Sequence, residues 1–275
     1  MAKILTKKQL NPDVYLFELE ANAISKKVEP GQFIILRVDE FGERVPLTIA
    51  DHDAIKGTIT IIVQAIGKTT LKLSKLNEGD SVLDLVGPLG RPTEIEEAKK
   101  VCVVGGGVGT AIAYPSAKYL ATHNVEVDMI AGFRNTEMII LENEMKAIAN
   151  DCVIMTDDGS NGNKGFVTNA LEELLKTKEY DLVIAIGPIP MMRAICDVTK
   201  AKNIKTIVSL NPIMIDGTGM CGGCRVTVDG QTKFACVDGP DFDGHKVDFS
   251  NLVERNRMYR DDESHQCRLM KEEVK

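Results

Sequence analysis

Four possible metal ligands near the C-terminal end constrain this chain most. Asp216 is followed by Cys221, Cys224 and Cys236 in the order D-x4-C-x2-C-x11-C, with four glycines among the first nine residues. This order matches the plant-type iron–sulfur spacing C-x4-C-x2-C…C, with a carboxylate in place of the first thiolate. Glycine has no side chain to clash, so the backbone can fold tightly around a small inorganic body. The spacing predicts a [2Fe–2S] cluster.

Two other uses of the cysteines are open at this point. His245 could join the three cysteines in a tetrahedral zinc site, because zinc accepts both thiolate and imidazole. A disulfide framework is disfavoured because the chain has seven cysteines, an odd number. The remaining cysteines lie in apolar or helical contexts and are expected to be ordinary thiols: Cys102, Cys152, Cys196 and Cys267.

Charge and hydropathy exclude several classes of function. The chain has 33 basic and 40 acidic side chains, and a net charge of -7 disfavours binding to nucleic acid or to a membrane surface. The N-terminus has no apolar signal segment, and no apolar run approaches the roughly 18 residues of a membrane span. We expect a cytoplasmic protein, and in that compartment exposed thiolates stay reduced and can hold a cluster.

Residues 1–98 are predicted to form a small antiparallel β barrel, because short strand patterns at 14–19, 33–38 and 58–65 alternate with turn residues. Residues 44–51 combine a cation, a rigid proline and a hydroxyl group, which suits a planar polar ring and a phosphate. Residues 67–70 precede a helix expected to begin at Leu71, and could bind a pyrophosphate. Taken alone, an edge strand with proline followed by a helix cap explains these stretches equally well.

Residues 99–210 alternate strands with helices. The strand at 101–104 ends in the glycine-rich turn 105–110 and a helix at 111–123, an arrangement that cradles a dinucleotide pyrophosphate. The strict dinucleotide fingerprint is absent because Thr110 takes the place of the third glycine and no acidic residue ends the next strand. The pattern predicts a parallel α/β unit, with further strands at 153–156, 182–186 and 206–210 and helices at 168–176 and 190–200.

The order of these motifs resembles the ferredoxin–NADP reductase superfamily, in its branch of electron-transfer subunits. Two kinds of subunit are similar: the iron–sulfur subunit of NAD-linked dihydroorotate dehydrogenase, and the small subunit of NADH-dependent reduced ferredoxin:NADP oxidoreductase, an electron-bifurcating transhydrogenase also called sulfide dehydrogenase. The second is similar to this chain in having aspartate at the first ligand position. The motifs are Arg44-x-Pro46-Leu47-Thr48, Gly67-x-Thr69-Thr70, Gly105 to Gly109, Gly187-Pro188-x-x-Met191 and the cysteine cluster.

The resemblance implies FAD in the barrel, NAD(H) on the α/β unit, and a [2Fe–2S] lobe with a tail at 211–275. It places FAD at Arg44, Pro46, Leu47, Thr48, Ile62, Val63, Gln64, Gly67, Thr69 and Thr70. It places the nicotinamide nucleotide at Gly105, Gly106, Gly107, Val108, Gly109, Thr110, Gly187, Pro188 and Met191, beside Asp157 or Asp158.

Two arginines need comment. The family usually has arginine immediately before the residue matching Pro46, where this chain has Val45, so Arg44 departs from the pattern. Arg134 follows the second strand of the α/β unit and could meet the 2′-phosphate of NADP, whereas the resemblance favours NADH.

The resemblance implies an oxidoreductase subunit in which electrons move between NAD(H), FAD and the cluster. A flavin is needed because hydride carries two electrons and the cluster accepts one at a time. The resemblance implies a heterodimer with a larger flavin and iron–sulfur subunit, through which ferredoxin and NADP would be reached indirectly. The tail at 251–275 is a candidate docking segment. The alternatives are the electron-transfer subunit of dihydroorotate dehydrogenase and, in a different class, a zinc-stabilised nucleotide-binding interaction module.

Overall fold

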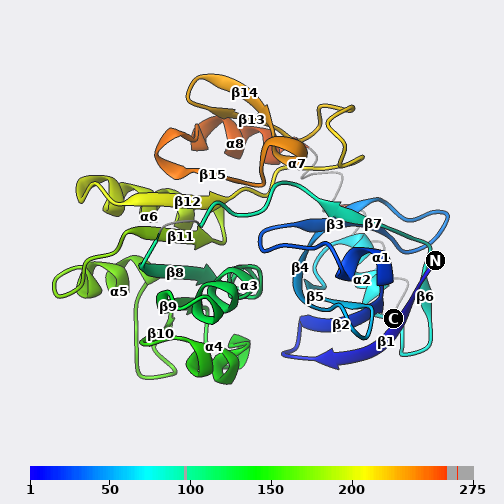
Figure 1. Ribbon diagram of the computed structural model, residues 1–275, viewed down its shortest axis with the longest axis horizontal. Coiled ribbons are helices and arrows are strands. Elements are labelled where there is room, and N and C mark those ends of the chain that lie inside the picture. The colour runs from blue at the N-terminus through cyan, green and yellow to red at the C-terminus, as the bar shows by residue number, and fades with distance from the viewer. Residues whose placement is uncertain (96–97, 259–264, 266–275) are drawn as a thin grey trace.

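The first part of the chain curls into a nearly closed antiparallel barrel (Figure 1). The structure is a computed structural model and describes residues 1–95, 98–258 and 265. Seven strands form one sheet in the order β6-β1-β2-β5-β4-β3-β7, and all neighbours are antiparallel. They are β1 (Ala2–Gln9), β2 (Val14–Glu20), β3 (Phe33–Arg37), β4 (Val45–Asp53), β5 (Thr58–Gln64), β6 (Ser81–Val82) and β7 (Asp84–Leu89), with helices α1 (Asn22–Ser25) and α2 (Lys68–Leu73) between them.

The alternating strand patterns place every second side chain inside this barrel. Phe17, Ile34 and Ile61 are fully buried in its core, which is separate from the cores of the second unit. The predicted antiparallel barrel is therefore confirmed. Helix α2 begins at Lys68, three residues before the predicted start, because Gly67 is the residue that caps it.

The second unit is a mostly parallel sheet with helices on both faces. Its strand order is β10-β9-β8-β11-β12-β15, and only the β12–β15 pair is antiparallel. The elements are β8 (Lys100–Gly106), α3 (Gly109–Thr122), β9 (Glu126–Phe133), η1 (Thr136–Met138), α4 (Glu142–Ile148), β10 (Cys152–Thr156), α5 (Val167–Leu174), β11 (Leu182–Ile186), α6 (Ile189–Ala201) and β12 (Lys205–Ser209). The predicted parallel α/β unit is confirmed.

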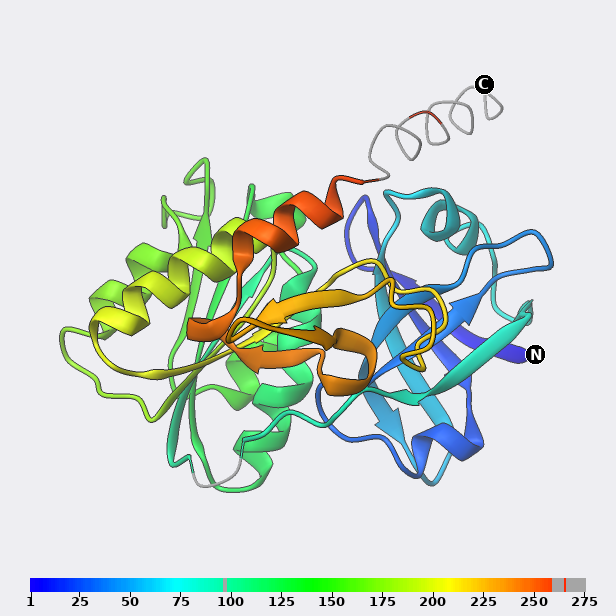
Figure 2. The same cartoon turned by 90° about the horizontal axis from the view of Figure 1, so that it is seen from above.

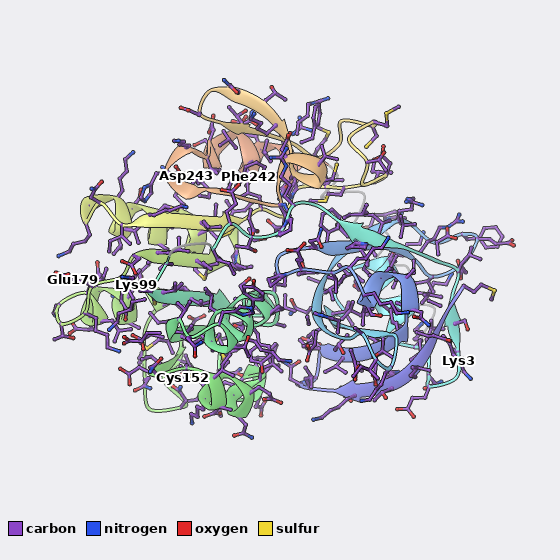
Figure 3. The ribbon with its side chains drawn as sticks, in the orientation of Figure 1. Lys3, Lys99, Cys152, Glu179, Phe242 and Asp243 are labelled. Carbon is purple, nitrogen blue, oxygen red and sulfur yellow. The ribbon has the colours of Figure 1, made fainter. Side chains whose placement is uncertain are left out.

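The C-terminal lobe lies across the junction of the two larger units (Figure 2). It contains β13 (Arg225–Val228), β14 (Gln231–Phe234), α7 (Ala235–Asp238), β15 (Asp241–Asp243), η2 (Gly244–Lys246) and α8 (Phe249–Asn256). Strand β15 completes the parallel sheet at its edge, and Figure 3 places Phe242 and Asp243 between β12 and the rest of the lobe. One hydrophobic core joins lobe residues to the sheet and to Phe33 and Ile35 of the barrel.

Side-chain bonds also fix the barrel to the parallel α/β unit. Asp51 on β4 pairs with Lys118 on α3 at 2.7 Å, and the side-chain amide of Asn11 donates to the Met138 carbonyl oxygen at 3.1 Å.

Within the described residues, no helix is long and apolar enough to cross a membrane.

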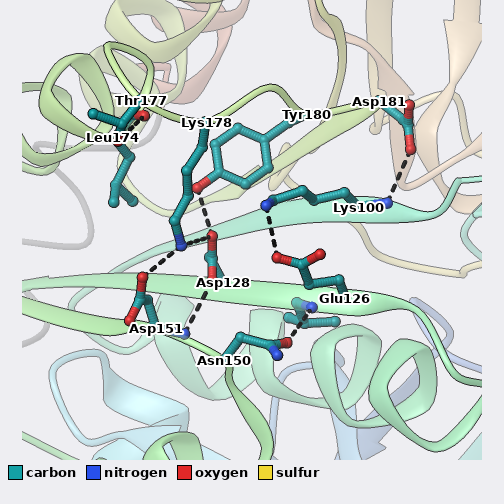
Figure 4. A network of polar contacts seen from close by, with 11 residues as sticks. Lys100, Glu126, Asp128, Asn150, Asp151, Leu174, Thr177, Lys178, Tyr180 and Asp181 are labelled. Atoms are coloured by element: carbon teal, nitrogen blue, oxygen red, sulfur yellow. Dashed lines mark hydrogen bonds and ion pairs between the residues drawn. The ribbon is translucent and has the colours of Figure 1, made fainter.

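A polar network ties together the amino-terminal end of the parallel sheet (Figure 4). The buried Asp128 on β9 accepts hydrogen bonds from Lys178 Nζ and from the Tyr180 hydroxyl, both at 2.6 Å. Its other oxygen accepts from the Asp151 amide at 3.0 Å, and Lys178 also pairs with the Asp151 carboxylate at 2.5 Å. The network therefore joins β9, the start of β10 and the segment before β11.

Candidate functional site

A cavity of about 980 Å³ separates the barrel from the carboxyl ends of the parallel strands. Its volume is at the upper end of the roughly 300–1,000 Å³ of small-molecule and cofactor sites, and it lies where ligands bind in open α/β sheets. Most of the residues predicted to bind nucleotide line it: Pro46, Leu47, Thr48, Ile62, Val63, Gln64, Gly67, Thr70, Gly106, Gly107, Val108, Gly109, Arg134, Asp157, Gly187, Pro188 and Met191.

On the barrel side, strands β4 and β5 form the wall of the cavity. The register between these strands begins only at Ile49, so the first residues of β4 pair with β3 alone. Pro46 pairs with Ile35 in this way, and a proline is tolerated where one side of a strand lacks a partner. The unpaired side of β4 leaves Pro46, Leu47 and Thr48 at the cavity.

The start of α2 closes this wall. Thr70 Oγ1 accepts a hydrogen bond from the Gly67 amide and donates one to the Gly67 carbonyl oxygen, both at 3.0 Å. The Thr69 hydroxyl instead donates to Glu43 at 3.2 Å, and Thr69 does not line the cavity. Of these predicted pyrophosphate-binding residues, Gly67 and Thr70 therefore face the cavity and Thr69 lies behind them.

On the sheet side, the glycine-rich turn after β8 approaches its neighbours too closely for side chains. A Cβ on Gly109 would lie 2.5 Å from the Ile186 carbonyl oxygen, and a Cβ on Gly105 would lie 2.6 Å from Thr110 Cα. Gly107 has φ +56° and open space beside it. Gly105 and Thr110 support the turn from behind, and the residues between them face the cavity.

The loops after β10 and β11 complete the sheet side. Asp157 lines the cavity, whereas Asp158 turns away and accepts a hydrogen bond from the Ser160 amide at 2.9 Å. The bonds from Ser160 lower the pKa of the Asp158 carboxyl. The sequence interpretation missed Phe166 and Thr168, which also line the cavity. Their signal was available, because they lie at the start of the helix that follows the strand at 153–156, and the glycine-rich turn leads into the helix that follows β8.

The predicted cluster ligands all lie on one loop and the first turn of α7. The sulfurs of Cys224 and Cys236 are 3.2 Å apart and buried, and Cys221 is exposed. The Asp216 carboxylate accepts hydrogen bonds from the Thr218 amide at 2.6 Å and the Cys221 amide at 3.0 Å. The Thr218 bond is the main effect that lowers the pKa of the Asp216 carboxyl. Among the residues that the structure describes, no three His, Cys, Asp or Glu side chains already converge as for a metal ion.

The predicted cluster ligands and His245 differ in their surroundings. Three thiols and one carboxylate lie on a segment bent by Gly217 at φ +80°. Burial and the neighbouring Cys224 thiol raise the pKa of Cys236 to about 12, so binding iron must displace this proton. His245, the fourth ligand of the zinc alternative, bonds to Thr199 Oγ1 at 3.0 Å, and this contact disfavours the zinc site.

Residues 215–239, called the cluster loop below, carry the predicted ligands and rest on the barrel. A Cβ on Gly217 would lie 2.8 Å from Leu89 Cδ1 and 2.9 Å from Ile35 Cγ1. Arg44, predicted to lie near the flavin, does not line the cavity; its Nε donates to the Ile215 carbonyl oxygen at 3.0 Å. The loop therefore rests on β3 and β7, and β3 pairs directly with β4 of the cavity wall.

Comparisons with known protein families divide the chain into three matching segments. Residues 1–93 match the oxidoreductase FAD-binding domain, and residues 103–197 match the oxidoreductase NAD-binding domain. Residues 211–248 match the iron–sulfur cluster binding domain of dihydroorotate dehydrogenase B. The predicted FAD, NAD and iron–sulfur binding is thus confirmed at the level of domains.

Similar proteins cover almost the whole chain. An uncharacterised protein of Clostridium beijerinckii is 49% identical over 96% of this chain and 92% of its own. A Thermotoga maritima protein named a homolog of the dihydroorotate dehydrogenase B (NAD(+)) electron transfer subunit is 46% identical over 95% of this chain and 92% of its own.

Among solved structures, one described as the NADH-dependent reduced ferredoxin–NADP oxidoreductase has 43% identity and a TM-score of 0.93, covering 98% of both chains. Phthalate dioxygenase reductase, with 18% identity and a TM-score of 0.61, shares the fold.

Proposed function

This chain belongs to the family of dihydroorotate dehydrogenase B electron-transfer subunits and their homologs, and from that premise we propose that it carries electrons from NADH to a partner subunit. It is an oxidoreductase subunit with FAD-, NAD- and iron–sulfur-binding domains. Bound FAD supplies the chemistry that accepts hydride from NADH and releases single electrons to a [2Fe–2S] cluster.

The observation that carries this proposal is the position of barrel strand β3. One neighbour of Ile35 on this strand is Pro46, which lines the cavity. The same Ile35 side chain packs against Gly217 of the cluster loop. A flavin in the cavity and a cluster in the loop would therefore lie on either side of the paired strands β3 and β4.

The chain's own residues hold the two nucleotides against each other. Thr48 lines the cavity and would face the flavin ring, and Gly67 with Thr70 would face the FAD pyrophosphate. The glycine-rich turn at 106–109 would face the other nucleotide, with Pro188 and Met191 on the nicotinamide side. Asp216, Cys221, Cys224 and Cys236 are the residues that would hold the cluster.

The exposed side of the cluster loop is the candidate docking surface for the larger subunit. Met220 is 85% exposed, Ile215 is 50% exposed and Val237 is 38% exposed, and each directly adjoins a predicted cluster ligand in the sequence. Apolar side chains gathered on a surface mark interaction sites. Most of the tail at 251–275, which the sequence suggests as a docking segment, lies outside the described residues.

We favour a ferredoxin–NADP oxidoreductase of the bifurcating kind over a dihydroorotate dehydrogenase as the complete enzyme. Two features support this choice: Asp216 at the first ligand position, and the 43% identity over almost all of both chains to the ferredoxin–NADP oxidoreductase structure. The complex purified anaerobically from its source should reduce NADP with NADH and reduced ferredoxin. Oxidation of dihydroorotate by the same preparation, without that reaction, would support the alternative.

An absorption spectrum of the anaerobically purified chain tests the central proposal. We expect the bands of oxidised flavin and of a ferric [2Fe–2S] cluster, and bleaching of both on addition of NADH. Iron and zinc analysis is the companion measurement. A colourless protein that holds one zinc ion would overturn the proposal in favour of the interaction module.

A further inference from the structure

Two arginines contact the two ends of the cluster loop, residues 215–239. Arg44 lies just before β4, and its guanidinium donates to the carbonyl oxygens of Ile215 at 3.0 Å and Asp216 at 3.4 Å. These carbonyl groups belong to the residues where the chain enters the loop. The sequence separation of 171 residues makes this a contact between units.

Arg91 makes the matching contact where the chain leaves the loop. Its Nε donates to the Val237 carbonyl oxygen at 3.2 Å, and its amide donates to the Gly239 carbonyl oxygen at 2.7 Å. Val237 directly follows Cys236, as Ile215 directly precedes Asp216. The first and last predicted ligands are thus each next to a carbonyl group held by an arginine.

Arg44 directly precedes a strand of the cavity wall, β4, whereas Arg91 follows β7, which pairs with β3 next to that wall. Arg44 is two residues before Pro46, and Arg91 is two residues after Leu89, which ends β7. Gly217 packs on Ile35 and Leu89 between the two contacts. A guanidinium has five donors in one rigid plane, so it can hold backbone carbonyl groups in a fixed direction.

We propose that Arg44 and Arg91 are positioning residues that clamp the cluster loop to the barrel. They would thereby fix the position of the loop relative to the barrel side of the cavity, where the flavin is proposed to bind. This inference rests on the proposed function, because it assigns the clamp to electron transfer between the two sites. It also gives Arg44 a task other than binding the flavin phosphate. The clamp explains why an arginine precedes β4 although the position next to Pro46 is Val45.

The test compares Arg44→Gln and Arg91→Gln with Arg37→Gln in the cofactor-loaded protein. Arg37 is the matched control, because it lies on β3 of the same barrel and pairs with Asp84 at 2.6 Å, not with the loop. Hydrogen exchange is measured at the loop amides, including those of Thr218 and Cys221. Losing a charge-assisted hydrogen bond should speed this exchange about tenfold to a hundredfold in the clamp variants.

Anaerobic stopped-flow mixing with NADH is the second measurement. In both clamp variants, cluster reduction should slow relative to flavin reduction, whereas the control should keep the wild-type ratio. Arg44→Lys should restore part of the exchange protection, because it keeps a cation without the planar fork.

Two results would overturn the clamp. One is loop exchange in both clamp variants that matches the control, and the other is an equal slowing of flavin and cluster reduction, which would place the arginines at the flavin. A wild-type protein that binds no flavin would instead refute the proposed function, and the exchange measurement would still decide whether the arginines hold the loop.

Discussion

Replacing Asp128 by asparagine should weaken the nucleotide-binding sheet at the end farthest from the cavity. Asp128 is buried and accepts from Lys178, Tyr180 and the Asp151 amide. The amide of asparagine keeps the size and one acceptor oxygen, but it removes the charge. Lys178, whose side chain is 20% exposed, would keep a charged partner only in Asp151.

The expected cost follows from the bonds that remain. Lys178 and Tyr180 bond to one oxygen of Asp128 and the Asp151 amide bonds to the other, and asparagine keeps only one of these two acceptors. The substitution therefore makes one acceptor into a donor that faces another donor, and it removes the charge that strengthens the Lys178 bond. Such a bond contributes about 2 kcal/mol. A change of that size makes local opening of the sheet about 30-fold more frequent.

Hydrogen exchange of the Met129 amide, which donates to the Asp151 carbonyl oxygen, measures this opening directly. Glu173→Gln is the control, because Glu173 and Lys176 form an ion pair with side chains 70% and 65% exposed. An exposed pair contributes less than about 1 kcal/mol, so the control should change this exchange little. Equal effects of Asp128→Asn and Glu173→Gln would refute the reasoning.

The same network gives a pH dependence. Burial alone would raise the pKa of Asp128, but the hydrogen bonds from Lys178 and Tyr180 outweigh it and the pKa is lowered. The unfolded chain then binds the proton more tightly, so the stabilisation is complete above the ordinary value of about 4 and is lost as pH falls through the folded pKa. The difference in melting temperature between wild type and Asp128→Asn should therefore shrink in acid; a constant difference would contradict this assignment.

Three further substitutions test the cavity and the loop. Gly109→Ala brings a Cβ to within 2.8 Å of backbone atoms of Ile186 and Gly187, and thermal melting should show a loss of about 1–3 kcal/mol or more. Gly107→Ala meets nothing within 4 Å and should cost only the left-handed backbone, about 1–2 kcal/mol; a larger loss than at Gly109 would contradict the packing. Asp216→Ala should reduce the iron content and leave the FAD content unchanged, and full iron content would show that another residue is the fourth ligand.

Local patterns were sufficient to predict the two large units. The strand at 182–186 has the predicted bounds. The glycine-rich turn lies at the cavity, as the strand-turn-helix pattern predicts, and Gly109 of this turn packs closely on the end of β11. Strand β4 was harder to interpret, since Pro46 suggested an edge strand. The strand is internal, yet its first residues lack one neighbour, so both features are present in the same element.

Contacts between distant segments were beyond the sequence patterns. Strand β15 has three residues, too few to show any periodicity, and it forms only because β12 offers an unpaired edge. Asp128 shows no sign in the sequence that its partners are Lys178 and Tyr180, about 50 residues away. The same limit applies to Arg44, which was expected to lie near the flavin. Its guanidinium instead bonds to the carbonyl oxygen of Ile215, 171 residues away in the sequence.

The antiparallel strand β15 has a consequence for the modularity of this protein. Because it supplies the last strand of the nucleotide-binding sheet, the cluster lobe cannot be exchanged for another electron carrier by cutting the chain at residue 210. Such a cut would leave β12 with an exposed row of unpaired amide and carbonyl groups, which promotes aggregation. A functional chimera would have to keep residues 241–243 in place and graft only the segment between the two arginine contacts.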